Sequence, residues 1–250
     1  MKPVQSEVNV VFGASGDIGS ALCRTLASRG SRLLLVARNA ERLETLSSEL
    51  DCPWRTVDGP SLELFDDCLQ AAKAEFGNVT GVVNCIGSLF LKPAHRISQE
   101  DWEATLSVNL GSAFATVAAA SKAMRRSGGS VVLVSSAAAL TGMPNHEAIA
   151  AAKAGIIGLT RSAAASYANY GLRFNAVSPG LVRTKMTKHL WSSEAAAAGS
   201  LAMHALGRLG EPDDVASSIA WLLDPKNDWV TGQDIAVDGG LAHVRGRVRK

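Results

Sequence analysis

Short apolar runs alternate with longer segments of helical periodicity along most of the chain. The runs are rich in Val, Leu and Ile and are flanked by Gly, Pro or Asp, which is typical of buried strands. The predicted strands are Val8–Phe12, Arg32–Ala37, Trp54–Val57, Val79–Asn84, Ser130–Ser135, Arg173–Ser178 and Asp234–Val237. Helices are expected near residues 18–29, 40–50, 61–76, 99–126, 147–170 and 212–223. This alternation predicts an α/β fold, a doubly wound parallel sheet of seven strands with helices on both faces.

Local signals support these helix positions, and no boundary divides the chain. Ser98 followed by Asp101 is typical of a helix N-cap, and Pro212 suits the first turn of a helix. No linker, repeat or block of charge separates two parts, so residues 1–250 are expected to form a single domain. Residues 185–206 follow the sixth strand with mixed polar and small residues. At this edge of a parallel sheet the insertion is expected to act as a lid, with an ordinary pair of surface helices as the alternative.

Composition narrows the possible partners. Of 250 residues, 47 % are hydrophobic and 19 % are charged, and the net charge of +2 gives no reason to expect nucleic acid as a partner. The basic tail, residues 241–250 with its charge run from Arg245 to Lys250, either stays solvated or touches an acidic neighbour. The four cysteines are widely spaced without a C-x-x-C pair, so neither a metal site nor a disulfide framework is expected.

The same composition indicates a soluble cytoplasmic protein. The first ten residues lack the apolar core of a signal peptide. No stretch approaches the ~20 apolar residues that span a bilayer, so no contact with a membrane is expected.

A glycine-rich turn follows the first predicted strand and precedes the first helix. Such a turn brings the phosphates of a nucleotide to the N-terminus of a helix, where free N–H groups and the helix dipole favour anions. The alternative, a plain glycine turn, is weakened by the position between strand and helix. The carboxylate of Asp17 is expected to point away from the phosphates, which it would repel. The residues expected to bind the nucleotide here are Gly13, Ser15, Gly16, Asp17, Ile18 and Gly19.

The end of the second strand indicates which nucleotide binds. An acidic residue there would accept hydrogen bonds from the ribose 2′-hydroxyl of NAD, but the chain has Ala37 followed by Arg38. The guanidinium of Arg38 can pair with a 2′-phosphate. NADP(H) is therefore expected in preference to NAD(H), with a solvated arginine as the alternative.

Several further motifs occur in a characteristic order. They are "VVFGASGDIG", "SVNLGS" with Asn109, "VLVSSAAAL" with Ser136, "AIAAAKAGIIGLT" with Lys153, and the close "RLGEPDDVASSIAWLL…VTGQDIAVDGG". Together they resemble the short-chain dehydrogenase/reductase family, most closely its 3-oxoacyl-thioester reductase-like members, from about residue 8 to residue 240. The resemblance implies a Rossmann-type fold and an oxidoreductase that uses a nicotinamide cofactor. It also implies further cofactor contacts at Asp58, Asn84, Gly87, Pro179, Gly180, Val182 and Thr184.

The resemblance implies a catalytic set from which one member is missing. Ser136 would polarise a carbonyl, Lys153 would hold the nicotinamide ribose, and Asn109 would hold a water linked to the lysine. In this family a tyrosine four residues before the lysine transfers the proton, but here that residue is Ile149. Water or His146, on the same helix face as Lys153, is the candidate substitute.

Neither tyrosine of the chain can replace the missing phenol. Tyr167 and Tyr170 lie on the same predicted helix as Lys153, about 20–25 Å farther along its axis.

Two hypotheses follow from this gap. The first is an NADP(H)-dependent oxidoreductase of the carbonyl or 3-oxoacyl reductase type, acting on a small carbonyl or alcohol substrate. The second is an NADP(H)-binding protein without turnover, acting as a sensor or as the inactive partner of an active paralogue. Small residues on the two long helices, such as Ala118–Ala120 and Ala163–Ala165, favour pairing into a homo-oligomer, a dimer or a tetramer, although packing within one chain would also explain them.

Overall fold

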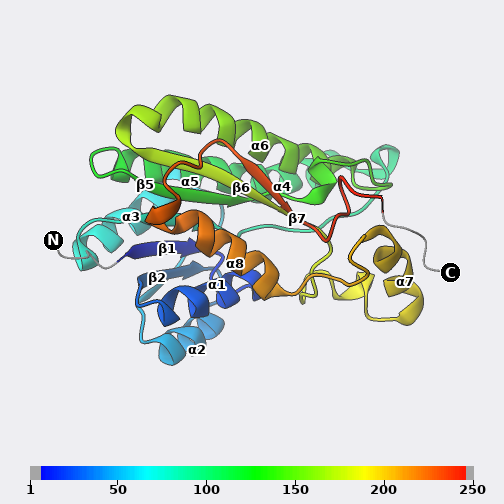
Figure 1. Ribbon diagram of the computed structural model, residues 1–250, viewed down its shortest axis with the longest axis horizontal. Coiled ribbons are helices and arrows are strands. Elements are labelled where there is room, and N and C mark those ends of the chain that lie inside the picture. The colour runs from blue at the N-terminus through cyan, green and yellow to red at the C-terminus, as the bar shows by residue number, and fades with distance from the viewer. Residues whose placement is uncertain (1–6, 246–250) are drawn as a thin grey trace.

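Seven parallel strands form one twisted sheet in the computed structural model, which describes residues 7–245 (Figure 1). The strands lie in the order β3-β2-β1-β4-β5-β6-β7. Their bounds are β1 Val8–Phe12, β2 Arg32–Ala37, β3 Trp54–Thr56, β4 Gly81–Asn84, β5 Gly129–Val134, β6 Leu172–Pro179 and β7 Asp234–Val237. The predicted fold class is confirmed, because continuous apolar strands are stable only when both faces of the sheet are covered.

Helices cover both faces of this sheet (Figure 1). Successive strand residues point to opposite faces, so Val10 belongs to the cluster beneath α3, α5 and α6, and Val11 to the cluster beneath α1, α2 and α8. The helices are α1 Asp17–Ser28, α2 Ala40–Leu50, α3 Leu62–Phe76, α4 Gln99–Leu106, α5 Ser112–Met124, α6 Glu147–Tyr167, α7 Glu194–Met203 and α8 Pro212–Leu223.

The order of the strands reverses between β1 and β4. The chain runs outward from β1 through β2 to β3 and then crosses back to β4, which pairs with β1 through Phe12 and Asn84. Ligands of such sheets bind at the carboxyl ends of the strands beside this reversal. The glycine-rich turn after β1 lies at this edge.

Two predicted helices are not continuous. The segment expected as one helix over 99–126 is α4 and α5 joined by a π-helical turn, Ser107–Gly111. The helix expected over 147–170 ends at Tyr167 and continues as a short 3₁₀ turn, Ala168–Tyr170. Strand ends also differ from prediction by one or two residues, since the apolar pattern does not fix where pairing stops.

The predicted helix starts agree with the structure. Ser98 Oγ accepts from the Asp101 amide at 3.1 Å, and Asp101 Oδ2 accepts from the Ser98 amide at 3.3 Å. This reciprocal pair caps α4. Pro212 is the first residue of α8.

The segment 185–206 lies beside the layers of the sheet and its covering helices (Figure 1). It contains a 3₁₀ turn, Lys188–Leu190, and α7. Of the predicted basic tail, residues 246–250 lie outside the described part of the chain.

One long apolar run corrects an expectation. The run Gln99–Met124 is long and apolar enough to cross a membrane by length and composition, although no such stretch was expected. Within the fold, 56 % of its apolar window is buried, and buried core helices pass the same test. Its small residues pack against α3 and the sheet, which explains the apolar composition.

Candidate active site

The turn after β1 has room for a ligand because three of its residues are glycines. A Cβ on Gly19 would lie 2.2 Å from the carbonyl oxygen of Gly13, and a Cβ on Gly13 would lie 2.8 Å from the Cys85 carbonyl carbon. Gly13 also has a φ of +80°, in the left-handed region that favours glycine. This backbone cradle at the start of α1 fits the diphosphate of a dinucleotide, which needs close approach and free N–H groups.

Asp17 is the first residue of α1, and its carboxylate has a defined partner. Asp17 Oδ2 accepts a hydrogen bond of 2.6 Å from the backbone N–H of Lys185, at the start of the predicted lid. The sequence indicated only that this carboxylate avoids a bound phosphate. The partner lies 168 residues away, so no local pattern could have identified it.

Arg38 and Asp58 follow the carboxyl ends of β2 and β3, and both side chains are exposed. Among the described residues neither forms a hydrogen bond or an ion pair, so both are open to a ligand. Asn39 caps α2 by accepting from the Arg42 amide at 2.8 Å. This cap places a second exposed cation, Arg42, in the first turn of α2, and the sequence analysis had not selected it.

Asn84 shapes the turn after β4 from the inside. Its amide nitrogen donates to the hydroxyls of Ser112 at 3.2 Å and Thr116 at 3.0 Å, and its carbonyl accepts from the Ile86 amide at 2.8 Å. These contacts engage both ends of the buried side chain. Asn84 therefore fixes the backbone around Gly87, and a direct contact to a ligand would have to come from that backbone.

Gly87 connects this turn to the predicted catalytic residues. A Cβ on Gly87 would lie 3.2 Å from Asn109 Oδ1 and 3.4 Å from Lys153 Nζ. The fold thus brings Gly87, Asn109 and Lys153 together, although they lie on three different elements. Glycine leaves the space beside the lysine ammonium open.

Asn109 lies in the π-helical turn and is fully buried. Its amide nitrogen donates to Ser88 Oγ and to the Thr105 carbonyl, both at 3.0 Å, and its carbonyl accepts from the Ser88 amide at 3.2 Å. The π turn inserts a residue into the helix at this point, and such turns often mark functional sites. Ser88, which the sequence analysis missed, accounts for two of these three contacts.

Lys153 is a buried cation on α6. Its ammonium donates to the Val134 carbonyl at 2.9 Å, and its side chain is only 7 % exposed. Burial lowers the pKa of Lys153 to about 8, since an ammonium loses solvation away from water. Burial raises the pKa of the neighbouring Cys85 thiol to about 12, so this thiol stays neutral and provides no counter-charge.

The two adjacent serines after β5 have different roles. The buried hydroxyl of Ser135 donates to the Lys153 carbonyl at 2.9 Å and so anchors α6 to the sheet. The partly exposed hydroxyl of Ser136 accepts from the Ala138 amide at 3.1 Å, which leaves its O–H free to donate. Of the two hydroxyls, that of Ser136 keeps its proton available for a ligand.

The position at which the family resemblance implies a tyrosine is covered by surrounding residues. Ile149 is 3 % exposed and belongs to neither of the two core clusters of the described residues.

His146, at the N-cap of α6, contacts the Pro144 carbonyl through Nδ1 at 2.8 Å. A carbonyl only accepts, so Nδ1 carries the proton and Nε2 is left to exchange one. Tyr167, at the far end of α6, contacts both Tyr170 and Phe174.

The loop after β6 contains the last predicted cofactor residues. Pro179 ends the strand, and a Cβ on Gly180 would lie 2.8 Å from His204 Nε2, so glycine is required for this packing. Val182 pairs with Gly210, and its carbonyl accepts from the Thr187 hydroxyl. The Thr184 hydroxyl bonds to that of Thr187 at 2.9 Å, and no short-range pattern had indicated either His204 or Thr187.

Known proteins resemble this chain over nearly its whole length. The family model described as Enoyl-(Acyl carrier protein) reductase matches residues 13–242. D-threitol dehydrogenase of Mycolicibacterium smegmatis is 32 % identical over 243 residues, which cover 95 % of this chain and 93 % of that relative. 3-Oxoacyl-(acyl-carrier-protein) reductase FabG of Thermotoga maritima is 32 % identical over 244 residues, which cover 95 % of this chain and 98 % of that relative. The chain belongs to the short-chain dehydrogenase/reductase family.

Structural comparison agrees with this membership. A crystal structure of actinorhodin polyketide ketoreductase with NADPH superposes with a TM-score of 0.90 at 29 % identity, covering 98 % of this chain and 100 % of that one. The short-chain dehydrogenase/reductase fold and the matching relatives place this chain among the NAD(P)H-dependent oxidoreductases. The glycine cradle, the open Arg38 and the buried Lys153 are the features of this chain that fit such a cofactor.

Proposed function

We propose that this protein is an NADP(H)-dependent reductase of small carbonyl compounds whose active site works without a tyrosine. The observation that carries the proposal is the buried ammonium of Lys153, held beside Gly87 and at hydrogen-bond distance from the Val134 carbonyl. A buried lysine without a carboxylate partner is unfavourable for folding and is typical of a functional site.

The residues have separable roles in this proposal. A bound nicotinamide supplies the hydride to the carbonyl carbon or takes it back in the reverse direction. Ser136 donates its free O–H to the carbonyl oxygen and stabilises the negative charge that develops there. Lys153 has two ammonium protons besides the one given to Val134, and these bind the ribose hydroxyls of the cofactor. Arg38 pairs with the 2′-phosphate, which gives the preference for NADP(H) over NAD(H).

The proton for the alkoxide comes from water or from His146. The contact of His146 Nδ1 with Pro144 fixes the ring and directs proton exchange to Nε2. General acid catalysis contributes typically 10²–10⁴-fold, so a site without the phenol retains hydride transfer at a reduced rate.

The second candidate is an NADP(H)-binding protein without turnover. Ile149 favours it, since an apolar, covered side chain replaces the proton donor. The two candidate functions share the cofactor site and differ only in whether the bound cofactor reduces a substrate.

Measuring binding and turnover separately distinguishes the two candidates. NADPH binding is measured by calorimetry, and NADPH oxidation is followed with a panel of ketones and 3-oxoacyl thioesters. Binding together with oxidation supports the reductase, and binding without oxidation across the panel supports the second candidate. Absence of binding contradicts both.

The substitution Ile149→Tyr tests directly whether a tyrosine at this position restores proton transfer. The new phenol would lie one helical turn from the Lys153 ammonium, which lowers the pKa of a neighbouring phenol. We expect turnover of a ketone to rise by about 10² or more, with NADPH affinity changed less than about twofold. His146→Ala in the otherwise unchanged protein is the control. A large loss of turnover in that variant would show that the histidine already serves as the acid, and the gain from Ile149→Tyr should then be small.

We also propose that the protein forms a homo-oligomer in the cytosol. An apolar depression of about 450 Å³ lies on the outer side of α4, α5 and α6, lined by Leu106, Leu110 and Leu159. Phe114, which is 53 % exposed, borders it. Light scattering measures the mass in solution, and Phe114→Glu should shift that mass toward a monomer.

A further inference from the structure

The start of the lid segment, residues 185–206, is tied to the start of α1 by a single side chain. The backbone N–H of Lys185 donates to Asp17 Oδ2 at 2.6 Å. Asp17 is in the first turn of α1, where the helix dipole stabilises a carboxylate. The helix start that forms the glycine cradle thus also holds the first residue of the lid.

The residues around Lys185 are linked to one another through one hydroxyl. Thr187 Oγ1 donates to the Val182 carbonyl at 2.5 Å and accepts from the Thr184 amide at 3.1 Å. It also accepts from the indole N–H of Trp191 at 3.1 Å. These bonds connect the chain on both sides of Lys185, from residue 182 to residue 191.

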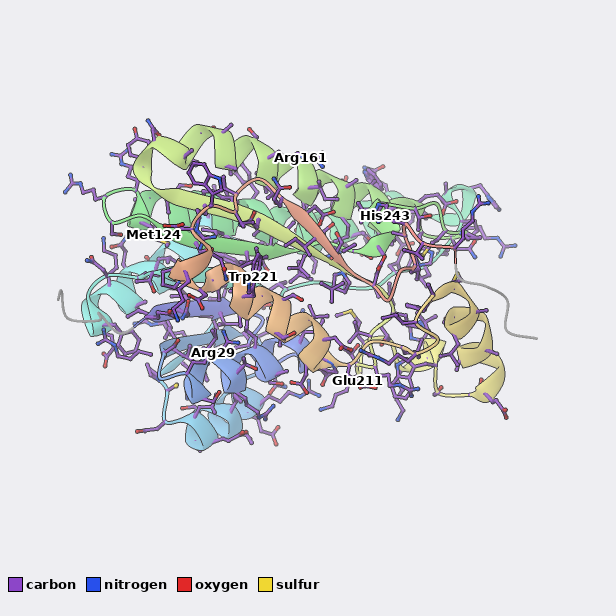
Figure 2. All side chains as sticks on the ribbon, in the orientation of Figure 1. Arg29, Met124, Arg161, Glu211, Trp221 and His243 are labelled. Carbon is purple, nitrogen blue, oxygen red and sulfur yellow. The ribbon has the colours of Figure 1, made fainter. Side chains whose placement is uncertain are left out.

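The far side of this unit is held by an ion pair. The Arg183 guanidinium lies over the Trp191 ring at 5.3 Å and pairs with Glu211 Oε1 at 3.3 Å. Glu211 lies at the start of α8, beside the segment that leads out of the lid (Figure 2). Arg183 and Glu211 are both exposed, so this ion pair contributes little by itself, and the Asp17 hydrogen bond is a second attachment of the same segment.

We propose that Asp17 is a positioning residue that holds the lid over the substrate site from the helix start that receives the cofactor diphosphate. The inference rests on the proposed reductase function. Holding the lid reduces the freedom of the loop that carries Thr184, so substrate binds to a site that is already shaped. Loss of the contact weakens substrate binding and leaves the hydride step itself intact, because Asp17 does not touch the residues that polarise the carbonyl.

Two variants at position 17 separate the hydrogen bond from the charge. Asp17→Ala removes the acceptor, whereas Asp17→Asn removes the charge and retains an acceptor oxygen. Hydrogen–deuterium exchange of peptides that cover residues 181–191 is measured without added nucleotide. We expect protection of the Lys185 amide to fall by about tenfold in Asp17→Ala, the change expected for one lost hydrogen bond, and to persist in Asp17→Asn.

Kinetics provide the second readout. In Asp17→Ala the KM for a carbonyl substrate should rise by about tenfold with kcat changed less than about twofold, since uniform binding is lost. Glu100→Gln, which removes a carboxylate from the first turn of α4, is the control for charge. Unchanged exchange in Asp17→Ala, an equal change in Glu100→Gln, or faster exchange without a change in KM would each overturn the proposal. Failure of the unmodified protein to bind NADPH in calorimetry would contradict the reductase function. The hydrogen–deuterium exchange result would then test only whether Asp17 holds the Lys185 amide.

Discussion

Replacing Lys153 with methionine should change how stability depends on pH. Methionine has a similar length and no charge, so the variant removes the buried ammonium and keeps most of the packing. Lys153 is 7 % exposed, and none of the ion pairs within residues 7–245 includes it. Its pKa falls from the ordinary value of 10.5 to about 8 because burial penalises the charged form.

The direction and size of the effect follow from this shift. Between pH 8 and pH 10.5 the unfolded chain binds a proton at this lysine and the folded chain releases it. The free energy of unfolding of the unmodified protein therefore rises with pH across this window. The shift corresponds to about 3 kcal/mol of unfolding free energy. Below pH 8 the folded protein is less stable by this full amount, and above pH 10.5 the penalty is absent. Methionine removes the penalty but leaves the buried Val134 carbonyl without its donor, which costs about 1–3 kcal/mol at every pH.

At pH 7 the two terms oppose each other and leave a net change of at most about 2 kcal/mol, and at high pH only the loss of the donor remains. We expect the stability of Lys153→Met relative to the unmodified protein to fall by about 3 kcal/mol between pH 7 and pH 10.5. Urea unfolding without nucleotide, at fixed protein concentration and in steps of pH, measures this difference. Lys226→Met, at an exposed lysine, is the control. Stability curves for Lys153→Met and the unmodified protein that run parallel from pH 7 to pH 10.5 would refute the reasoning.

Two further predictions concern the cofactor. NADPH should bind at least about tenfold tighter than NADH, and Arg38→Asp should reverse this order, because a carboxylate accepts from a ribose hydroxyl and repels a phosphate. Calorimetry with both nucleotides checks this, and equal affinities in the unmodified protein would contradict it. Gly19→Ala should weaken NADPH binding by about tenfold or more, since its Cβ would lie 2.2 Å from the Gly13 carbonyl oxygen and deform the cradle. Unchanged NADPH binding would contradict this prediction, because it would show that the glycine-rich turn accommodates the added Cβ without losing affinity.

The sequence predicted those features that depend on neighbours along the chain. The seven strands follow from apolar runs that must be covered on both faces, and the cap of α4 follows from the spacing of Ser98 and Asp101. The need for glycine at position 19 is likewise local, since its added Cβ would meet the carbonyl of Gly13. One continuous helix was expected over residues 99–126, because composition does not distinguish a π turn from regular helix.

Only the tertiary structure decided which polar groups form hydrogen bonds with each other. Partners that are far apart along the chain produce no periodic pattern in the sequence. Ser135 and Ser136 are adjacent and chemically equal, yet only the pairing of β5 with α6 directs one to the Lys153 carbonyl and leaves the other free. Asn84 was expected only to allow close approach of the backbone to a ligand, and the fold alone shows that its amide group is held by Ser112 and Thr116 on α5. The short sequence around Lys153 does not set its pKa, because the three-dimensional packing that excludes water is the cause of that shift.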